Sequence, residues 1–223
     1  MNASTPASRT SHPGAAAFIP PDAGMPDLAV AVQGCRGCDL YQDATQAVFG
    51  SGPTTARVML VGEQPGDQED RSGEPFVGPA GRLLDTALSE AGFSRPEVYV
   101  TNVVKHFRFT RPRGKQRIHK SPARWQVAAC GPWLLAELAL VRPEVVVLLG
   151  GTAGQAVFGP EFRVTKARGS VLAWPQADLP VPSPPWCVPT AHPSAVLRSR
   201  HRDEDLAALV ADLRLAATTS TRR

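Results

Sequence analysis

Short, largely apolar runs recur along the middle of the chain and predict strands that are buried on both faces. Each run is four to seven residues long, and a glycine or a polar residue follows it. Runs of this length that end in this way are typical of strands in a covered sheet. The predicted strands span residues 57–61, 98–104, 145–149 and 186–189.

Segments with helical periodicity lie between and after these runs. Residues 80–91 place leucine and alanine three and four positions apart, and Gly92 follows, a residue type that commonly ends helices. From about residue 122 to 140, Gly131-Pro132 predicts a break or a kink, because proline cannot donate a backbone hydrogen bond. Further helices are predicted just after Gly151 and over residues 203–216.

The alternation of strands and helices predicts an α/β fold with helices on both faces of a central sheet. We expect a three-layer α/β/α domain with a mostly parallel sheet of four strands. Ligands of such sheets bind at the carboxyl ends of the strands. The loops at those ends span residues 62–80, 102–120, 150–154 and 190–198 and hold most of the chemically unusual side chains.

The chain of 223 residues is long enough for one domain with a sizeable core. Residues 1–25 are rich in alanine, serine, threonine, proline and glycine and are predicted to be disordered. Residues 218–223 are expected to be frayed, which leaves a single domain over residues 26–217. No apolar run approaches the 18 residues of a membrane span, and the first residues lack the pattern of a secretory signal.

Positive charge is concentrated in one segment of the chain. Residues 105–124 contain eight lysines and arginines and no acidic residue, whereas the rest of the chain has 16 basic and 20 acidic residues. A basic segment on a mildly acidic body is typical of a protein that binds a polyanion such as a nucleic acid. A solvated, disordered charge run is the alternative that composition leaves open.

The loop after the first predicted strand carries a dense polar motif. It reads GEQPGDQED from Gly62, and PFVGPAG follows from Pro75. A loop this polar must face water or a ligand, but it matches neither a Walker A loop nor a dinucleotide-binding G-x-G-x-x-G motif. An ordinary turn between a strand and a helix is the alternative.

Three motifs together resemble the uracil-DNA glycosylase superfamily. GEQPGDQED and PFVGPAGRLLD resemble motif A of its family 4, and HPSAVLR at 192–198 resembles the second signature of that family. GKQRIHKSP at 114–122 resembles the basic loop of the uracil-DNA glycosylase X branch, which typically reads KRRIH, so Gln116 departs from the pattern. The resemblance extends from about Cys35 to the last helix and implies the uracil-DNA glycosylase fold.

The resemblance implies a pocket for a uracil that has been flipped out of DNA. Phe76 would stack on the base, Asn102 would pair with its O4 and N3–H, and His192 would hydrogen-bond O2 of the leaving uracil. Gln64 and Asp67 would shape the pocket. Taken singly, Phe76, Asn102 and His192 also have purely structural interpretations. They could be a core phenylalanine, an asparagine of a turn or helix cap, and a loop histidine whose hydrogen bonds are satisfied within the protein.

Glu63 and His119 are the residues that the resemblance places at the reacting sugar. Glu63 would stabilise an oxocarbenium-like cation or activate water. His119 would attack the electrophilic C1′ after uracil leaves and would form a covalent adduct with DNA. The alternative is a histidine that only contacts phosphate, in an enzyme that releases an abasic site by ordinary hydrolysis.

Contacts with DNA are expected from the basic loop and from the second signature. The residues predicted to bind DNA are Lys115, Arg117, Lys120, Ser194 and Arg198. Single-stranded DNA is the preferred substrate on this hypothesis, because it carries no cost of unpairing the base. Free uracil is the expected product.

Four cysteines in a chain without a secretory signal are more typical of metal ligands or free thiols than of disulfides. Family 4 enzymes hold a [4Fe–4S] cluster, and the resemblance places Cys35, Cys38 and Cys130 among its ligands. His106 stands at the position of another family cysteine, and histidine can ligate cluster iron. Cys187 is the fallback ligand.

These features predict a monomeric enzyme of the bacterial cytoplasm, with no membrane partner, that excises uracil and stays attached to DNA through His119. Two alternatives from other classes remain open. One is a non-catalytic module that binds uracil-containing DNA. The other is an iron–sulfur redox or sensing protein for which DNA is a secondary partner.

Overall fold

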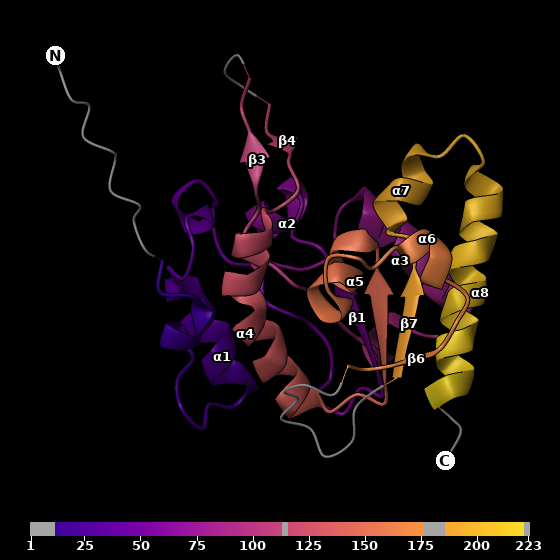
Figure 1. Cartoon of the computed structure of the whole chain (residues 1–223), viewed down its shortest axis with the longest axis horizontal. Coiled ribbons are helices and arrows are strands. Elements are labelled where there is room, and N and C mark those ends of the chain that lie inside the picture. The colour runs from indigo at the N-terminus through magenta and orange to yellow at the C-terminus, as the bar shows by residue number, and fades with distance from the viewer. Residues whose placement is uncertain (1–11, 113–115, 176–185, 221–223) are drawn as a thin grey trace, which may run out of the picture.

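The computed structural model describes residues 12–112, 116–175 and 186–220. The strands of its central sheet are β1 (Val58–Gly62), β2 (Tyr99–Asn102), β5 (Val145–Leu149), β6 (Leu172–Ala173) and β7 (Trp186–Thr190). Their order is β2-β1-β5-β7-β6, with four parallel strands and an antiparallel β6 at one edge (Figure 1). The mostly parallel sheet is confirmed, but it has five strands where four were predicted. A strand of two residues such as β6 is too short to show any periodicity.

Helices cover both faces of this sheet, which confirms the three-layer α/β/α fold. They are α1 (Met25–Ala31), α2 (Asp67–Ser72), α3 (Pro79–Glu90), α4 (Arg124–Val141), α5 (Gly151–Phe158), α6 (Val164–Ala167), α7 (Pro193–Arg198) and α8 (Arg202–Ser220). Single 3-10 turns are η1 (Ala15–Phe18), η2 (Val32–Gly34), η3 (Leu40–Gln42) and η4 (Arg95–Glu97). No helix in the described ranges is long and apolar enough to cross a membrane.

Alternate strand residues enter two separate halves of the core. Leu60 and Val147 pack with residues of α3, α7 and α8, whereas Met59 and Val146 pack with residues of α4 and α5. Because neither side of the central strands faces water, the strands read as continuous apolar runs in the sequence.

Helix α4 continues through Pro132, so of the predicted break or kink at Gly131-Pro132 the break is wrong. Proline normally clashes with the Cβ of the residue before it, and Gly131 has no Cβ, so this clash is absent. The helix loses one hydrogen bond at Pro132 and keeps the burial of Trp133, Leu134 and Leu138 against the core.

Both ends of the domain extend beyond the predicted boundaries. Ala15 is buried in η1, and the Gly14 N–H donates to the Gly37 carbonyl over 3.0 Å, so ordered structure begins before residue 26. At the other end, α8 continues to a buried Ser220, past the predicted limit at residue 217. The rest of each predicted tail, residues 1–11 and 221–223, lies outside the described ranges.

The basic segment folds as a hairpin, although the sequence predicts only a loop. Strands β3 (Phe109–Thr110) and β4 (Ile118–His119) pair antiparallel, with Phe109 opposite His119. The hairpin projects from the edge of the sheet toward which the parallel strands point (Figure 1). It therefore places His119 beside the loops at the carboxyl ends of the strands.

Candidate active site

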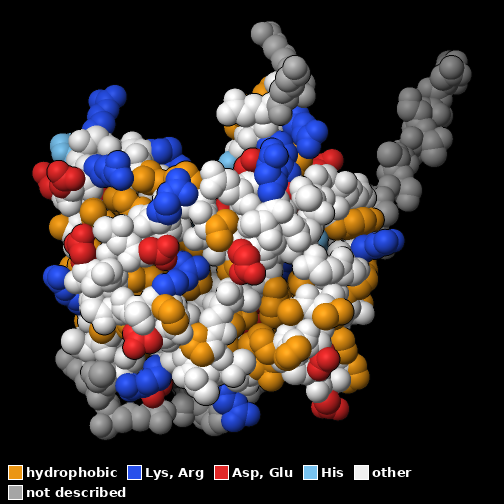
Figure 2. Space-filling model, turned by 180° about the vertical axis from the view of Figure 1, so that it is seen from behind, with side chains coloured by type: hydrophobic (Ala, Val, Ile, Leu, Met, Phe, Trp, Pro, Cys, Tyr) orange, Lys and Arg blue, Asp and Glu red, His pale blue; other side chains and the backbone are white. Residues whose placement is uncertain are grey.

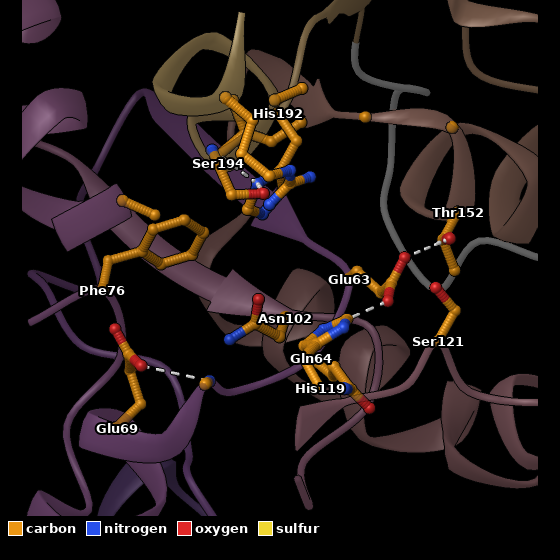
Figure 3. Close-up of a pocket in the computed structure, with 17 residues that line it drawn as sticks. Glu63, Gln64, Glu69, Phe76, Asn102, His119, Ser121, Thr152, His192 and Ser194 are labelled. Carbon is orange, nitrogen blue, oxygen red and sulfur yellow. Dashed lines mark hydrogen bonds and ion pairs between the residues drawn. The ribbon is translucent and has the colours of Figure 1, made fainter. Parts of the chain in front are cut away.

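A cavity of about 530 Å³ lies at the carboxyl ends of the parallel strands. This volume is in the range of pockets that enclose small molecules. Residues from the loops after β1, β2, β5 and β7 and from the hairpin line it together (Figure 3). The predicted site residues that line it are Glu63, Gln64, Phe76, Asn102, His119, His192, Ser194 and Arg198.

Phe76 forms one wall of the cavity and is held there by close backbone packing. Its φ of 56° lies in the left-handed region, which is uncommon for a bulky residue and marks a specialised site. A Cβ at Gly81 would lie 1.7 Å from the Phe76 carbonyl oxygen, so only glycine fits there. The buried Phe76 ring stacks on the His192 ring, with centroids 6.0 Å apart and planes 29° apart.

Asn102 ends β2 and presents its amide to the same cavity. A Cβ at Gly62 would lie 2.4 Å from Asn102 Oδ1 and 2.6 Å from the Phe76 ring, so the glycine lets both side chains approach the strand end. Asn102 Oδ1 is buried and has no hydrogen-bond partner among the described residues. An unsatisfied buried acceptor is costly, which makes this oxygen a site for a ligand donor.

A buried ion pair supports Asn102 from behind. Lys105 Nζ donates to Glu137 Oε2 over 2.6 Å, to Thr101 Oγ1 over 2.7 Å and to the Asn102 carbonyl over 2.8 Å. The Lys105 and Glu137 side chains are both 0% exposed. Lys105 belongs to the basic segment, but its burial removes it from any surface that DNA can contact.

Glu63 follows β1 with its carboxylate between two partners. Thr152 Oγ1 donates to Oε2, and Oε1 lies 3.5 Å from His119 Nε2 (Figure 3). Like the amide oxygen of Asn102, Oε1 is buried and has no hydrogen-bond partner in the described part of the chain. The structure thus brings together Glu63 and His119, which are 56 positions apart in the sequence.

His119 stands at the mouth of the cavity with half of its side chain exposed (51%). Partial burial lowers its pKa below the usual value, the charge of Arg198 acts in the same direction, and the charge of Glu63 opposes both. The ring is therefore mostly neutral at neutral pH, with a nitrogen lone pair available.

His192 is a neutral donor aimed into the cavity. Burial lowers its pKa to about 4, and the positive charges of Arg198 and of His119, when His119 is protonated, add to the effect. Its Nδ1 accepts the backbone N–H of Ser194 over 3.1 Å. A neutral imidazole with an accepting Nδ1 carries its hydrogen on Nε2, which is the atom left free to donate.

Gln64 lines the cavity, but its amide atoms are bound to the hairpin. Its Nε2 donates to the Arg108 and Lys120 carbonyls over 3.1 and 3.2 Å, and its Oε1 accepts the Arg108 N–H over 3.1 Å. Gln64 therefore shapes the pocket, as predicted, by fixing both arms of the hairpin over the cavity.

Arg117 is also used inside the protein. Its guanidinium forms ion pairs with Asp67 and Asp70 and packs over the Phe107 and Phe109 rings, and only 5% of its side chain is exposed. Asp67 is not among the cavity residues. In this structure Arg117 and Asp67 anchor the hairpin together, and their predicted roles in DNA binding and in the uracil pocket stay predictions.

The other predicted DNA contacts remain available on the surface. Lys120 is exposed beside the hairpin, and Ser194 and Arg198 line the cavity. Lysine and arginine side chains gather at the base of the projecting hairpin (Figure 2). Lys115 lies outside the described residues.

Three of the four cysteines share one buried cluster. Cys35, Cys38 and Cys130 pack together between the N-terminal segment and α4, and all are free thiols. Two N–H groups point at their sulfurs: the Lys105 backbone N–H to Cys130 Sγ and Trp133 Nε1–H to Cys35 Sγ, both over 3.3 Å. Burial raises the pKa of Cys130 to about 12 and also raises that of Cys38.

His106 and Cys187 differ in their relation to this cluster. His106 is buried next to Lys105, whose N–H contacts Cys130. Cys187 packs in a different half of the core, with Met59 and Val146. Within the described ranges, no three histidine, cysteine or acidic side chains converge to hold a single metal ion.

Sequence reasoning missed two residues that shape the cavity, Glu69 and Thr152. Glu69 accepts the N–H groups of Gly66 over 3.1 Å and Gly78 over 2.8 Å, so it ties together the two ends of the loop that carries Phe76. The spacing of Gly66 and Glu69, typical of a helix start, was a detectable signal for this role. Thr152 had no such signal, because only the fold brings it to Glu63.

Comparisons with known proteins agree with this arrangement. The family model described as the Uracil DNA glycosylase superfamily matches residues 49–214. The type-4 uracil-DNA glycosylase of Thermotoga maritima is 39% identical over 173 residues, which cover 77% of this chain and 82% of the relative. Those of Sulfurisphaera tokodaii and Archaeoglobus fulgidus are each 36% identical, over 73% and 81% of this chain and 71% and 87% of the relatives. The chain therefore belongs to the uracil-DNA glycosylase superfamily.

Proposed function

We propose that this protein excises uracil from DNA and that His119 then captures the DNA covalently. The observation that carries the proposal is the placement of His119 Nε2 only 3.5 Å from Glu63 Oε1, at the mouth of a cavity with a free Asn102 amide oxygen. A sugar carbon that reaches the carboxylate would also be within reach of the imidazole.

Recognition of the base would use the unsatisfied groups of the cavity. N3–H of a flipped uracil would donate to Asn102 Oδ1, and the amide nitrogen of Asn102 would donate to O4. Cytosine has no N3–H and would leave Oδ1 unsatisfied, which favours uracil. The base would lie against the Phe76 ring. Single-stranded DNA is the proposed preferred form, because its bases need no unpairing.

Departure of the base would use His192 and Glu63. As the bond from C1′ to N1 breaks, the electron pair stays on the uracil, and His192 Nε2–H would donate to the oxygen that gains charge. A neutral imidazole suits this role because it remains a donor without being protonated. The Glu63 carboxylate would stabilise the positive charge that develops at the sugar.

Capture would follow at the same carbon. The lone pair of His119 Nε2 would form the new bond to C1′, and the ring would then lose its Nδ1 proton to solvent. This step needs the neutral ring that partial burial of His119 favours. Because the product is an N-alkylated imidazole, each protein molecule would act once.

Ordinary hydrolysis is the second candidate. The half-exposed position of His119 leaves room for water at the cavity mouth, and the similar proteins include type-4 uracil-DNA glycosylases. Glu63 would then activate a water molecule, and a free abasic site would be released. This candidate uses the same base-binding residues and differs only in the nucleophile.

We further propose that Cys35, Cys38, His106 and Cys130 hold a [4Fe–4S] cluster. The three thiols in one buried group and the two N–H donors aimed at their sulfurs support this donor set. Each ligand of such a cluster binds a different iron, so the ligands need not meet at one point. The cluster would cross-link the N-terminal segment, the segment after β2, and α4.

Metal and sulfide analysis of the purified protein is expected to give about four irons per chain.

A denaturing gel tests the main proposal. The protein is mixed with a labelled single-stranded oligonucleotide that contains one uracil, and a thymine oligonucleotide serves as the control. A uracil-dependent band of lower mobility that survives heat and detergent is the expected result. Strand breakage after alkali without that band would instead support ordinary hydrolysis. The absence of both the shifted band and the strand breakage would contradict uracil excision itself.

A further inference from the structure

The residue that holds the Glu63 carboxylate lies outside the basic loop, which carries His119, and outside the second signature, which carries His192. Thr152 Oγ1 donates a hydrogen bond to Glu63 Oε2. Thr152 is the second residue of α5, the helix that follows β5, and it also lines the cavity. Figure 3 shows the Glu63 carboxylate between Thr152 on one side and His119 on the other.

This contact makes the two carboxylate oxygens unequal. Oε2 is satisfied by the hydroxyl, whereas Oε1 is buried without a hydrogen-bond partner and faces His119. Without the hydroxyl, the carboxylate could rotate about its last bond and turn either oxygen toward the cavity. The hydrogen bond therefore determines which oxygen faces the reacting carbon and in which direction its lone pairs point.

The position of the hydroxyl is itself fixed by the fold. The Gly150 N–H donates to the Thr190 carbonyl over 2.9 Å, which ties the start of α5 to β7. Ala153, the next residue after Thr152, is fully buried in the core beneath the helix. A donor on such a rigid support can hold a catalytic group in place with little cost in entropy at the moment of reaction.

We propose that Thr152 is the positioning residue of Glu63, holding Oε2 so that Oε1 faces C1′ and His119. This inference rests on the proposed function, in which Glu63 stabilises charge at the sugar. It adds a residue that lies outside motif A, the basic loop and the second signature. It also predicts that loss of the hydroxyl impairs uracil release and capture together, because both depend on the same carboxylate.

Two substitutions test the role of the hydroxyl. Thr152→Val keeps the shape of the side chain and removes the donor, and Thr152→Ser keeps the donor. In single-turnover experiments, the valine variant is expected to release uracil about 10- to 100-fold more slowly, the range for a lost hydrogen bond to a charged group. The serine variant is expected to stay near the wild-type rate. The protein concentration that gives half of the maximal rate should not change in either variant.

Thr86→Val is the matched control. The Thr86 hydroxyl is exposed on α3 and donates only to the Arg82 carbonyl, so this variant is expected to keep the wild-type rate. A wild-type rate in Thr152→Val would overturn the inference. An equal loss in Thr152→Ser and Thr152→Val would also overturn it, because the loss would then come from packing.

A second measurement separates this inference from the proposed function. The His119 ring, which faces Glu63, Arg198 and His192, can be titrated by NMR in both proteins without DNA. In Thr152→Val, Oε1 of Glu63 is no longer held toward the imidazole, so the upward effect of Glu63 weakens and the His119 pKa is expected to fall relative to the wild type. An unchanged titration would show that Thr152 does not hold Glu63, even if wild-type protein released no uracil. A shifted titration in a protein that releases no uracil would contradict only the proposed function.

Discussion

Replacing His119 by serine is expected to abolish the heat-stable adduct while uracil release continues. The residues proposed to hold the base and to support its departure lie on other elements, so their geometry should survive the change. Serine is much smaller than histidine, and its hydroxyl is a weak nucleophile without an adjacent base. Water would then reach C1′ beside Glu63, and abasic sites would accumulate. Gel mobility before alkali measures the adduct, and strand breakage after alkali measures release.

His201→Ser is the matched control for this experiment. His201 is exposed between α7 and α8, where 74% of its side chain contacts solvent, so its loss should leave the adduct in place. An adduct that persists in His119→Ser would identify another nucleophile and contradict the assignment. Loss of both adduct and strand breakage would mean that His119 is needed before the base leaves.

The sequence predicts the central sheet well because strands that are buried on both faces appear in the sequence as continuous apolar runs. Residues 145–149 read as five consecutive apolar residues and form β5 with the predicted bounds. The hairpin shows no such pattern, since Phe109–Thr110 and Ile118–His119 are too short for a period and form only where Gln64 and Arg117 anchor them. Its structure depends on tertiary contacts that no local pattern encodes.

In the candidate site, too, some features could be predicted from the sequence and others could not. Glu63, Asn102 and His192 could be placed together because each lies near the carboxyl end of a predicted parallel strand, and such strands end at one edge of the sheet. The sequence could not predict which charged side chains are exposed and which form buried ion pairs, because burial depends on the whole fold. Lys105 and Arg117 belong to the same basic segment, yet both are used in internal ion pairs.

These internal ion pairs have a functional consequence. Lys105 joins the carbonyl of Asn102 to Glu137 on α4, and its backbone N–H contacts Cys130 on the same helix. Removing one partner of a buried pair leaves an uncompensated charge, which is strongly destabilising. The buried pair therefore connects the residue proposed to recognise uracil with the cysteine cluster through α4.

Replacing Glu63 by glutamine is expected to slow uracil release by about 10²- to 10⁴-fold, the range for loss of a catalytic acid, base or charge. Glutamine keeps the size of the side chain and can still accept the Thr152 hydroxyl, so the change removes charge with little effect on packing. Affinity for uracil-containing DNA should remain near that of the wild type, because Asn102 and Phe76 would still hold the base. Single-turnover release and direct binding measurements separate the two effects.

Glu161→Gln removes the same charge from a side chain that is 92% exposed and should leave the rate of release unchanged. The two variants together distinguish an enzyme from a binding module. A module that only binds uracil-containing DNA would show no uracil release in either variant or in the wild type. An enzyme in which Glu63 does not act at the sugar would keep its rate in Glu63→Gln. Only a loss confined to Glu63→Gln, with binding preserved, fits a carboxylate that acts on the transition state and contributes little to holding the substrate.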